Sequence, residues 1–320
     1  MLSRALKLMG DSRTAKAVVT RTTLRAMSRR FVPGDSVDDL LGAVRQARGL
    51  RLATTTNYLG EAVEEETHAR AAAATYVRVL DRLSAEGLEA NVSIKLTQLG
   101  HDIGPAVLAA SLAQVLERAR DVGALVRFDM ESSAHTTRTL ETFTELSEAG
   151  WTNIGVVLQA NLRRTADDVA RMIRLGAPVR LCKDAYLEPA GVAFQDKAEV
   201  DRSFVTLARR LLSWGHRPAL ATHDERMIDA ALEFVARESI PNDAFEFQML
   251  HGVRRDLQRQ LATDGWRVRV YVPFGEQWYP YLMRRLAERP ANVLFLAGSL
   301  VRESPIGFLL PGRRRPRRAS

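Results

Sequence analysis

The sequence predicts an α/β protein folded as a (β/α)8 barrel, and two observations carry this prediction. Eight short runs rich in β-branched and apolar residues recur between residues 50 and 274. Stretches with helical periodicity separate them, and such a regular alternation of strand and helix is typical of one parallel barrel. A chain of 320 residues has the length that a single barrel needs.

The expected strands follow one another at intervals that leave room for a helix. They lie at residues 50–58, 90–96, 125–130, 153–160, 178–184, 217–223, 244–250 and 268–274. One intervening helix is expected in "GPAVLAASLAQVLERARDVG", and another in "SFVTLARRLLSWG", which ends at a glycine suited to a C-cap. The organisation is therefore a helical segment at 1–48, a barrel at 49–310 and a basic disordered tail at 311–320.

A last helix is expected in "WYPYLMRRLAER", directly after the eighth strand. Its spacing gathers Tyr281, Arg284, Arg285 and Glu288 on the face opposite an apolar stripe. This polar face is either a solvated surface with an Arg284 to Glu288 pair, or a lid turned over the barrel opening.

Composition favours a cytoplasmic protein. The single cysteine, Cys182, excludes an internal disulfide, and the apolar run "VLFLAGSLV" is too short to span a bilayer. The net charge of +8 is raised by "RRRPRR" at 313–318 and by the arginine-rich first 30 residues. We expect these ends to be solvated, with peripheral contact at the inner face of the cell membrane as the alternative and no nucleic-acid partner.

Polar residues gather at the carboxyl ends of the expected strands, where the loops of such barrels form the active site. Among them are Asn57, Glu61, Lys95, Asp129, Glu131, Gln159, Arg180, Lys183, Thr222, His223, Gln248 and Tyr271. So many polar ends meeting at one opening indicate a binding or catalytic site.

The residue types at this opening suit a small amino acid and an anionic cofactor. Paired arginines donate to a carboxylate in planar fashion, and an ion pair between Lys95 and Asp129 would set the charge around a substrate amine. Five other residues form a donor set for an extended anionic cofactor: Gln159, Arg180, Lys183, Thr222 and His223. The sequence has neither a P-loop nor a GxGxxG turn, and no metal site is expected because no second histidine stands at ligand spacing from His223.

Several longer motifs resemble the proline dehydrogenase family in order and spacing over about residues 30–300. They are "RFVPGD", "TTNYLGE", "VSIKLT", "VVLQANL", "VRLCKDAY", "ATHD", "FEFQMLHGVR" and "VRVYVPFGEQWYPYLMRRLAERPAN". The resemblance implies a distorted barrel with a C-terminal lid helix that holds FAD without a Rossmann domain. It also implies oxidation of L-proline to Δ1-pyrroline-5-carboxylate, with electrons passed to membrane quinone and a separate pyrroline-5-carboxylate dehydrogenase as the pathway partner.

The resemblance also implies a role for each site residue. Arg284 and Arg285 would hold the proline carboxylate, and Glu61 would pair with the first of them as a gate. Four residues would surround the substrate, namely Lys95, Asp129, Tyr271 and Tyr281. Arg180 would lie beside the flavin, and the rest of FAD would contact Gln159, Lys183, Thr222, His223 and Lys197.

One departure from the family pattern bears on function. Asp184 stands where the family usually has a glycine, which places a carboxylate beside the expected FAD site. Two other functions therefore stay open: a flavin-binding or amino-acid-binding homologue with little activity, and a Schiff-base aldolase that uses Lys95 or Lys183 as its nucleophile.

Overall fold

The computed structural model describes residues 28–184 and 186–288, and the fold is given for these residues. The helical segment expected at 1–48 is therefore described from residue 28 on, and the basic tail expected at 311–320 lies outside the described residues. No helix in the described ranges is long and apolar enough to cross a membrane.

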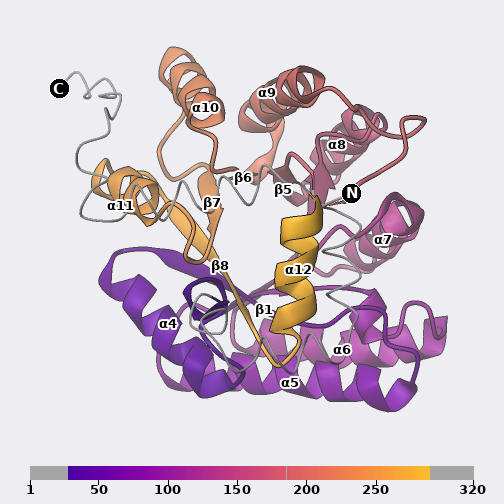
Figure 1. Ribbon diagram of the computed structural model, residues 1–320. Coiled ribbons are helices and arrows are strands. Elements are labelled where there is room, and N and C mark those ends of the chain that lie inside the picture. The colour runs from indigo at the N-terminus through magenta and orange to yellow at the C-terminus, as the bar shows by residue number, and fades with distance from the viewer. Residues whose placement is uncertain (1–27, 185, 289–320) are drawn as a thin grey trace.

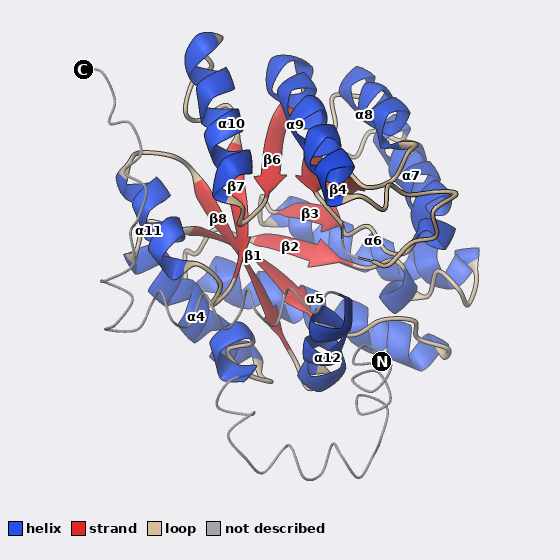
Figure 2. Ribbon diagram, turned by 45° about the horizontal axis from the view of Figure 1, so that its top comes forward, coloured by secondary structure: helices blue, strands red, loops and turns tan. Residues whose placement is uncertain are grey.

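Eight parallel strands close into a barrel in sequence order, which confirms the predicted fold class. β1 pairs with β8 along its whole length, from Ala53 opposite Arg269 to Tyr58 opposite Phe274. The strands are β1 (Ala53–Tyr58), β2 (Asn91–Ile94), β3 (Leu125–Phe128), β4 (Ile154–Gln159), β5 (Pro178–Cys182), β6 (His216–Ala221), β7 (Glu246–Leu250) and β8 (Val268–Phe274). Each lies at a predicted position, and Figure 2 shows them enclosed by helices.

Each of the first seven strands leads into a helix on the outside of the barrel, and the eighth leads into α12 (Figure 1). A leading helix, α4 (Val37–Gly49), precedes β1. The others are α5 (Glu66–Ala85), η1 (Thr97–Leu99) with α6 (Pro105–Asp121), α7 (Ser133–Glu148), α8 (Thr165–Arg174), α9 (Lys197–Trp214), α10 (Glu225–Arg237), α11 (Arg255–Thr263) and α12 (Trp278–Glu288).

Local sequence signals explain where several helices begin. Ser36 and Asp39 form a reciprocal capping box at the start of α4. Asp196 caps α9 by accepting hydrogen bonds from two backbone amides, and Asp224 caps α10 through the amide of Arg226.

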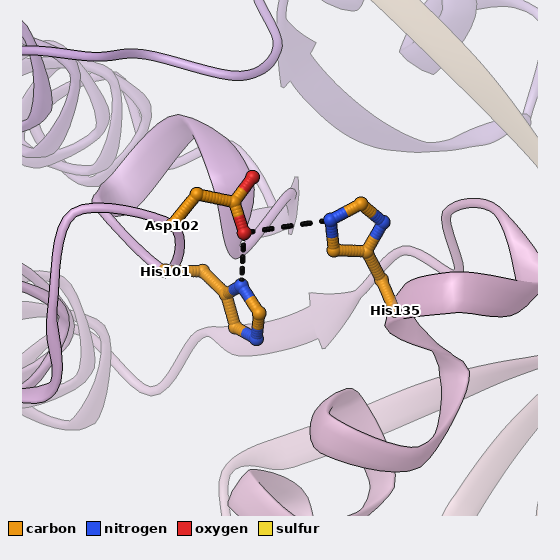
Figure 3. Close-up of side chains that lie close together, drawn as sticks. All are labelled: His101, Asp102 and His135. Carbon is orange, nitrogen blue, oxygen red and sulfur yellow. Dashed lines mark hydrogen bonds and ion pairs between the residues drawn. The ribbon is translucent and has the colours of Figure 1, made fainter.

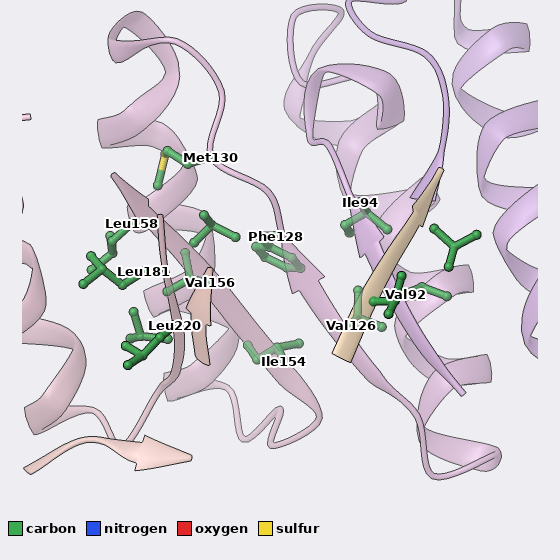
Figure 4. Close-up of a cluster of buried hydrophobic side chains, with 14 of the residues drawn as sticks. Val92, Ile94, Val126, Phe128, Met130, Ile154, Val156, Leu158, Leu181 and Leu220 are labelled. Carbon is green, nitrogen blue, oxygen red and sulfur yellow. The ribbon is translucent and has the colours of Figure 1, made fainter. Parts of the chain in front are cut away.

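Alternate residues of the strands face opposite sides of the barrel wall, so one set of side chains packs outside the wall and the other fills the barrel interior. The apolar set packs outward against the helices, and its members include Val92, Ile94, Val126, Phe128, Ile154, Val156 and Leu158 (Figure 4). Residues of the other parity, among them Ser93, Arg127 and Arg180, are buried and polar. The barrel therefore has an apolar outside and a charged inside.

The charged inside holds a buried ion pair near the amino-terminal ends of the strands. Arg269 donates to Glu246 at 2.8 Å and to the Thr54 carbonyl at 2.7 Å. Gln248 donates to the same Glu246 carboxylate at 2.5 Å. Burial raises the pKa of Glu246, but the positive charges of Arg269 and Arg127 outweigh it and lower that pKa to about 2.

Helix α12 packs on a second, smaller apolar cluster. Trp278, Tyr279 and Leu282 of α12 join Leu59, which follows β1, and Val253, which follows β7. These partners lie beyond the carboxyl ends of their strands, and Figure 1 shows α12 crossing in front of the barrel. The helix is therefore placed on the side where the barrel opens.

Removing the Glu246 charge tests the buried ion pair. We expect Glu246→Gln to lower the free energy of unfolding by about 3 to 5 kcal/mol, because Arg269 and Arg127 lose the buried carboxylate between them. Glu89 pairs with the same Arg269 at 2.7 Å but its side chain is 51% exposed. Glu89→Gln should therefore cost no more than about 1 kcal/mol. Urea denaturation followed by circular dichroism measures both, and equal losses would contradict the account.

Candidate active site

A guanidinium group that crosses the barrel forms the centre of the site. Arg180 of β5 is bonded to Asp129, which directly follows β3. The same guanidinium donates to Ser93 at 3.2 Å and to Gln248 at 3.1 Å. Tyr271 of β8 donates its hydroxyl to the other Asp129 oxygen at 2.7 Å. These contacts join strands that are not neighbours, so the five side chains meet inside the barrel.

The environment keeps Tyr271 protonated. Burial, followed by the negative charge of Asp129, raises the pKa of Tyr271 well above its usual range. The phenol ring also lies beneath Arg180, with the guanidinium carbon 5.3 Å from the ring centroid. Tyr271 therefore acts as a hydrogen-bond donor and a rigid wall.

Lys95 is paired differently from the prediction. Its ammonium lies 3.6 Å from the Glu61 carboxylate, whereas the described partners of Asp129 are Arg180 and Tyr271. The expected Lys95–Asp129 ion pair was wrong, because the planar guanidinium and the phenol occupy both Asp129 oxygens. The pair with Lys95 places Glu61 at the opening. The predicted gate, a pair between Glu61 and Arg284, stays a prediction, because the Arg284 side chain lies outside the described part of the structure.

Glu131 ties the loop after β2 to the loop after β3. Its carboxylate accepts from the Thr97 amide at 3.2 Å and from the Thr97 hydroxyl at 2.5 Å. Burial raises the pKa of Glu131 despite these bonds. Its carbonyl accepts from the Gln159 amide at 3.0 Å. This hydrogen bond fixes the side chain of Gln159, a predicted cofactor residue, at the end of β4.

The structure brings two predicted lysines into one ionic cluster. Lys183 pairs with Asp201 at 2.5 Å and Asp224 at 2.9 Å, and Lys197 pairs with Asp201 at 2.5 Å. Arg226 pairs with both acids at 3.2 Å. Burial raises the pKa of each aspartate, but the hydrogen bonds and charges of these cations lower it overall. Asp201, Asp224 and Arg226 were not among the predicted site residues, although the N-cap position of Asp224 was a signal.

Thr222 and His223 follow β6 on the same side of the barrel. The Thr222 hydroxyl accepts from the Asp224 amide at 3.1 Å, and the His223 Nε2 accepts from the Leu250 amide at 2.8 Å. His223 therefore carries its proton on Nδ1 when neutral, because Nε2 is the acceptor. Both stay predicted cofactor residues.

Asp184 is half-buried at the end of β5, beside Lys183. The two cations nearest to it in sequence already bond other acids, Lys183 to Asp201 and Asp224, and Arg180 to Asp129. Lys183 and Arg180 therefore each serve other carboxylates close to Asp184.

The lid helix contributes one described side chain to the predicted substrate set. Tyr281 of α12 is buried, 8% exposed, in the cluster beneath that helix. Arg284 and Arg285 belong to α12, but their side chains lie outside the described part of the structure.

This arrangement defines a class of protein: a barrel enzyme whose opening holds a buried cation, an acid and a protonated phenol, next to a second, more exposed ionic cluster. The family model for proline dehydrogenase matches residues 40–298. The chain belongs to the proline dehydrogenase family of enzymes.

Individual relatives agree with this family. The chain is 37% identical over 288 residues to a proline dehydrogenase from Deinococcus radiodurans, covering 89% of this chain and 93% of that one. It is 35% identical over 303 residues to proline dehydrogenase 1 of Bacillus subtilis, covering 95% and 100%. A solved structure of proline utilization A from Bdellovibrio bacteriovorus, inactivated by N-propargylglycine, matches with a TM-score of 0.80 and 28% identity. It covers 92% of this chain, which spans only 36% of that protein.

His251, which directly follows β7, was not singled out from sequence. Burial, followed by the charge of Arg255, lowers the pKa of His251 from 6.5 to about 4. The unfolded chain takes up this proton near pH 6.5 and the folded chain only near pH 4, so protonation favours unfolding between these values.

We therefore expect the His251 contribution to stability to be complete above about pH 6.5 and to be lost progressively toward pH 4. His251→Gln should flatten the fall in unfolding free energy across this window, measured by urea denaturation at stepped pH. His216→Gln, which removes an exposed histidine, is the control. A wild-type slope in His251→Gln would contradict the prediction.

Proposed function

We propose that the protein oxidises L-proline to Δ1-pyrroline-5-carboxylate with FAD as its cofactor. The observation that carries the proposal is the bonded group of Arg180, Asp129 and Tyr271 at the opening of a proline dehydrogenase family barrel. Such a group supplies fixed charge and a flat wall for a small amino acid.

The residues at the opening fit FAD. The cluster of Lys183, Lys197 and Arg226 against Asp201 and Asp224 offers three cationic donors to an anionic ligand, and the adjacent Asp184 carboxylate offsets part of their charge. Asn161, two residues after the end of β4, has a buried side-chain oxygen with no hydrogen-bond partner among the described residues. That oxygen is suited to accept from a ligand N–H. Gln159, Thr222 and His223 complete the set that would hold the cofactor.

The chain's own residues would orient and polarise the substrate. When bound, FAD supplies the oxidant, which takes up a hydride from C5 of proline. The ring nitrogen also loses a proton, so that an imine results. Arg284 and Arg285 would hold the carboxylate, Tyr271 and Tyr281 would wall the ring, and Lys95 and Asp129 would set the charge around the nitrogen.

The electrons would pass to membrane quinone, and the product would be consumed by a separate pyrroline-5-carboxylate dehydrogenase. A soluble barrel that contacts the inner face of the cell membrane peripherally suits this transfer. Lys183 is paired with two acids and Lys95 lies beside Glu61, and such pairing keeps a lysine protonated, which argues against a Schiff-base aldolase.

Turnover tests the proposal. The purified protein with FAD and a soluble quinone should consume L-proline and release a product that gives the yellow adduct of pyrroline-5-carboxylate with o-aminobenzaldehyde. D-Proline is the control. Tight flavin binding with no turnover of L-proline would instead favour a binding homologue.

The carboxylate clamp is tested by Arg284→Met and Arg285→Met. Loss of one partner of a buried charged contact costs about 2 to 5 kcal/mol, so kcat/KM for proline should fall tens-fold or more while flavin content stays the same. Arg259→Met, at an exposed position of α11, is the matched control. Wild-type kinetics in both clamp variants would remove the clamp from the proposal.

Asp184 is tested by a pair of substitutions that separate charge from bulk. Two unit charges about 6 Å apart at an effective dielectric near 20 interact by about 3 kcal/mol, enough to weaken FAD binding about a hundredfold. If the Asp184 charge weakens FAD binding, Asp184→Asn should bind FAD more tightly than the parent. If the Asp184 side chain instead obstructs the cofactor, only Asp184→Gly should bind FAD more tightly. Titration of apoprotein with FAD distinguishes these results, and parental affinity in both variants would show that Asp184 is silent.

A further inference from the structure

Two histidines and an aspartate meet beside the barrel opening, outside the site described above (Figure 3). His101 and Asp102 lie in the loop between η1 and α6, after β2. His135 lies in the first turn of α7, after β3. The two loops follow neighbouring strands, and the three side chains converge although 34 positions separate the histidines.

The spacing of the three donor atoms is that of a metal site. One ring nitrogen of each histidine and one Asp102 oxygen all lie within 4.8 Å of one another. Zinc bonds of about 2.0 to 2.2 Å in tetrahedral geometry place two ligand atoms about 3.3 Å apart. The His135 to Asp102 distance is 3.4 Å, close to that value. The His101 to Asp102 distance is 2.6 Å, a hydrogen bond that a metal would replace.

The remaining nitrogen of His135 is positioned by a second contact. Its Nδ1 lies 3.1 Å from the Ser132 hydroxyl, one residue before α7 begins. Metal-binding histidines commonly make such a bond through the nitrogen that does not face the metal, because it orients the ring and selects the tautomer. Ser132 is therefore a positioning residue for His135.

We propose that His101, Asp102 and His135 form a binding site for a divalent transition metal ion, with Zn²⁺ as the best match. Two imidazoles and one carboxylate are the ligand types that zinc accepts, whereas Mg²⁺ and Ca²⁺ favour oxygen ligands alone. The Asp102 side chain is 44% exposed, so water reaches the cluster and can complete a fourth position.

Bound metal would join the two loops that carry site residues. Lys95 precedes His101 on the β2 side, and Glu131 precedes His135 on the β3 side, where Thr97 already ties the loops together. A metal ion would add a second tie farther from the barrel. No metal site was predicted from sequence, because that prediction rested on the spacing of histidines around His223. His101 and His135 are far apart in sequence and come together only because they follow neighbouring strands.

The test uses the full chain without a histidine tag, stripped with EDTA and titrated with Zn²⁺ by calorimetry. We expect one equivalent to bind and the melting temperature to rise with Zn²⁺. His101→Gln and His135→Gln should each weaken binding at least about 100-fold and abolish the thermal shift, and Ser132→Ala should weaken binding about tenfold.

His216→Gln removes an exposed histidine elsewhere and should bind Zn²⁺ like the parent. Asp102→Asn provides a third ligand variant if either histidine variant fails to fold, as judged by circular dichroism. Absence of one-equivalent binding in the parent would overturn the proposal. So would binding of parental strength in the folded ligand variants.

Discussion

The bond between Arg180 and Asp129 is the interaction on which the site depends. Arg180 projects from β5 across the barrel, and its partners come from β2, β3 and β7. A guanidinium buried to this extent is costly unless its donors are satisfied, and here each described partner is itself part of the wall or directly follows it. The position of Asp129, and with it that of Tyr271, follows from this requirement.

The polar contacts continue from the opening toward the other end of the barrel. Gln248 accepts from Arg180 and donates to Glu246, which is paired with Arg269. The carboxylates and guanidiniums thus alternate inside the wall, while the apolar side chains pack outside it. Burial of the Arg180, Glu246 and Arg269 charges is tolerated because each lies next to an opposite charge.

Much of the fold was predictable, because strands whose outer face packs on helices leave recognisable runs rich in apolar and β-branched residues. All eight runs became strands, although ranges such as 178–184 extended past the last paired residue, Cys182. Pairings across the barrel were not predictable. Lys95 and Asp129 follow neighbouring strands, yet Asp129 bonds Arg180 from β5 and Tyr271 from β8, at separations of 51 and 142 positions. Periodicity gives the face of a strand but not the partner that crosses the interior.

The central proposal is that the opening that contains Arg180, Asp129 and Tyr271 oxidises proline through a bound flavin. The most direct measurement is the visible spectrum of the purified protein before and after anaerobic addition of L-proline. The account predicts a yellow protein whose flavin absorbance is bleached by L-proline and not by D-proline. A flavin that stays oxidised in the presence of saturating L-proline would contradict it.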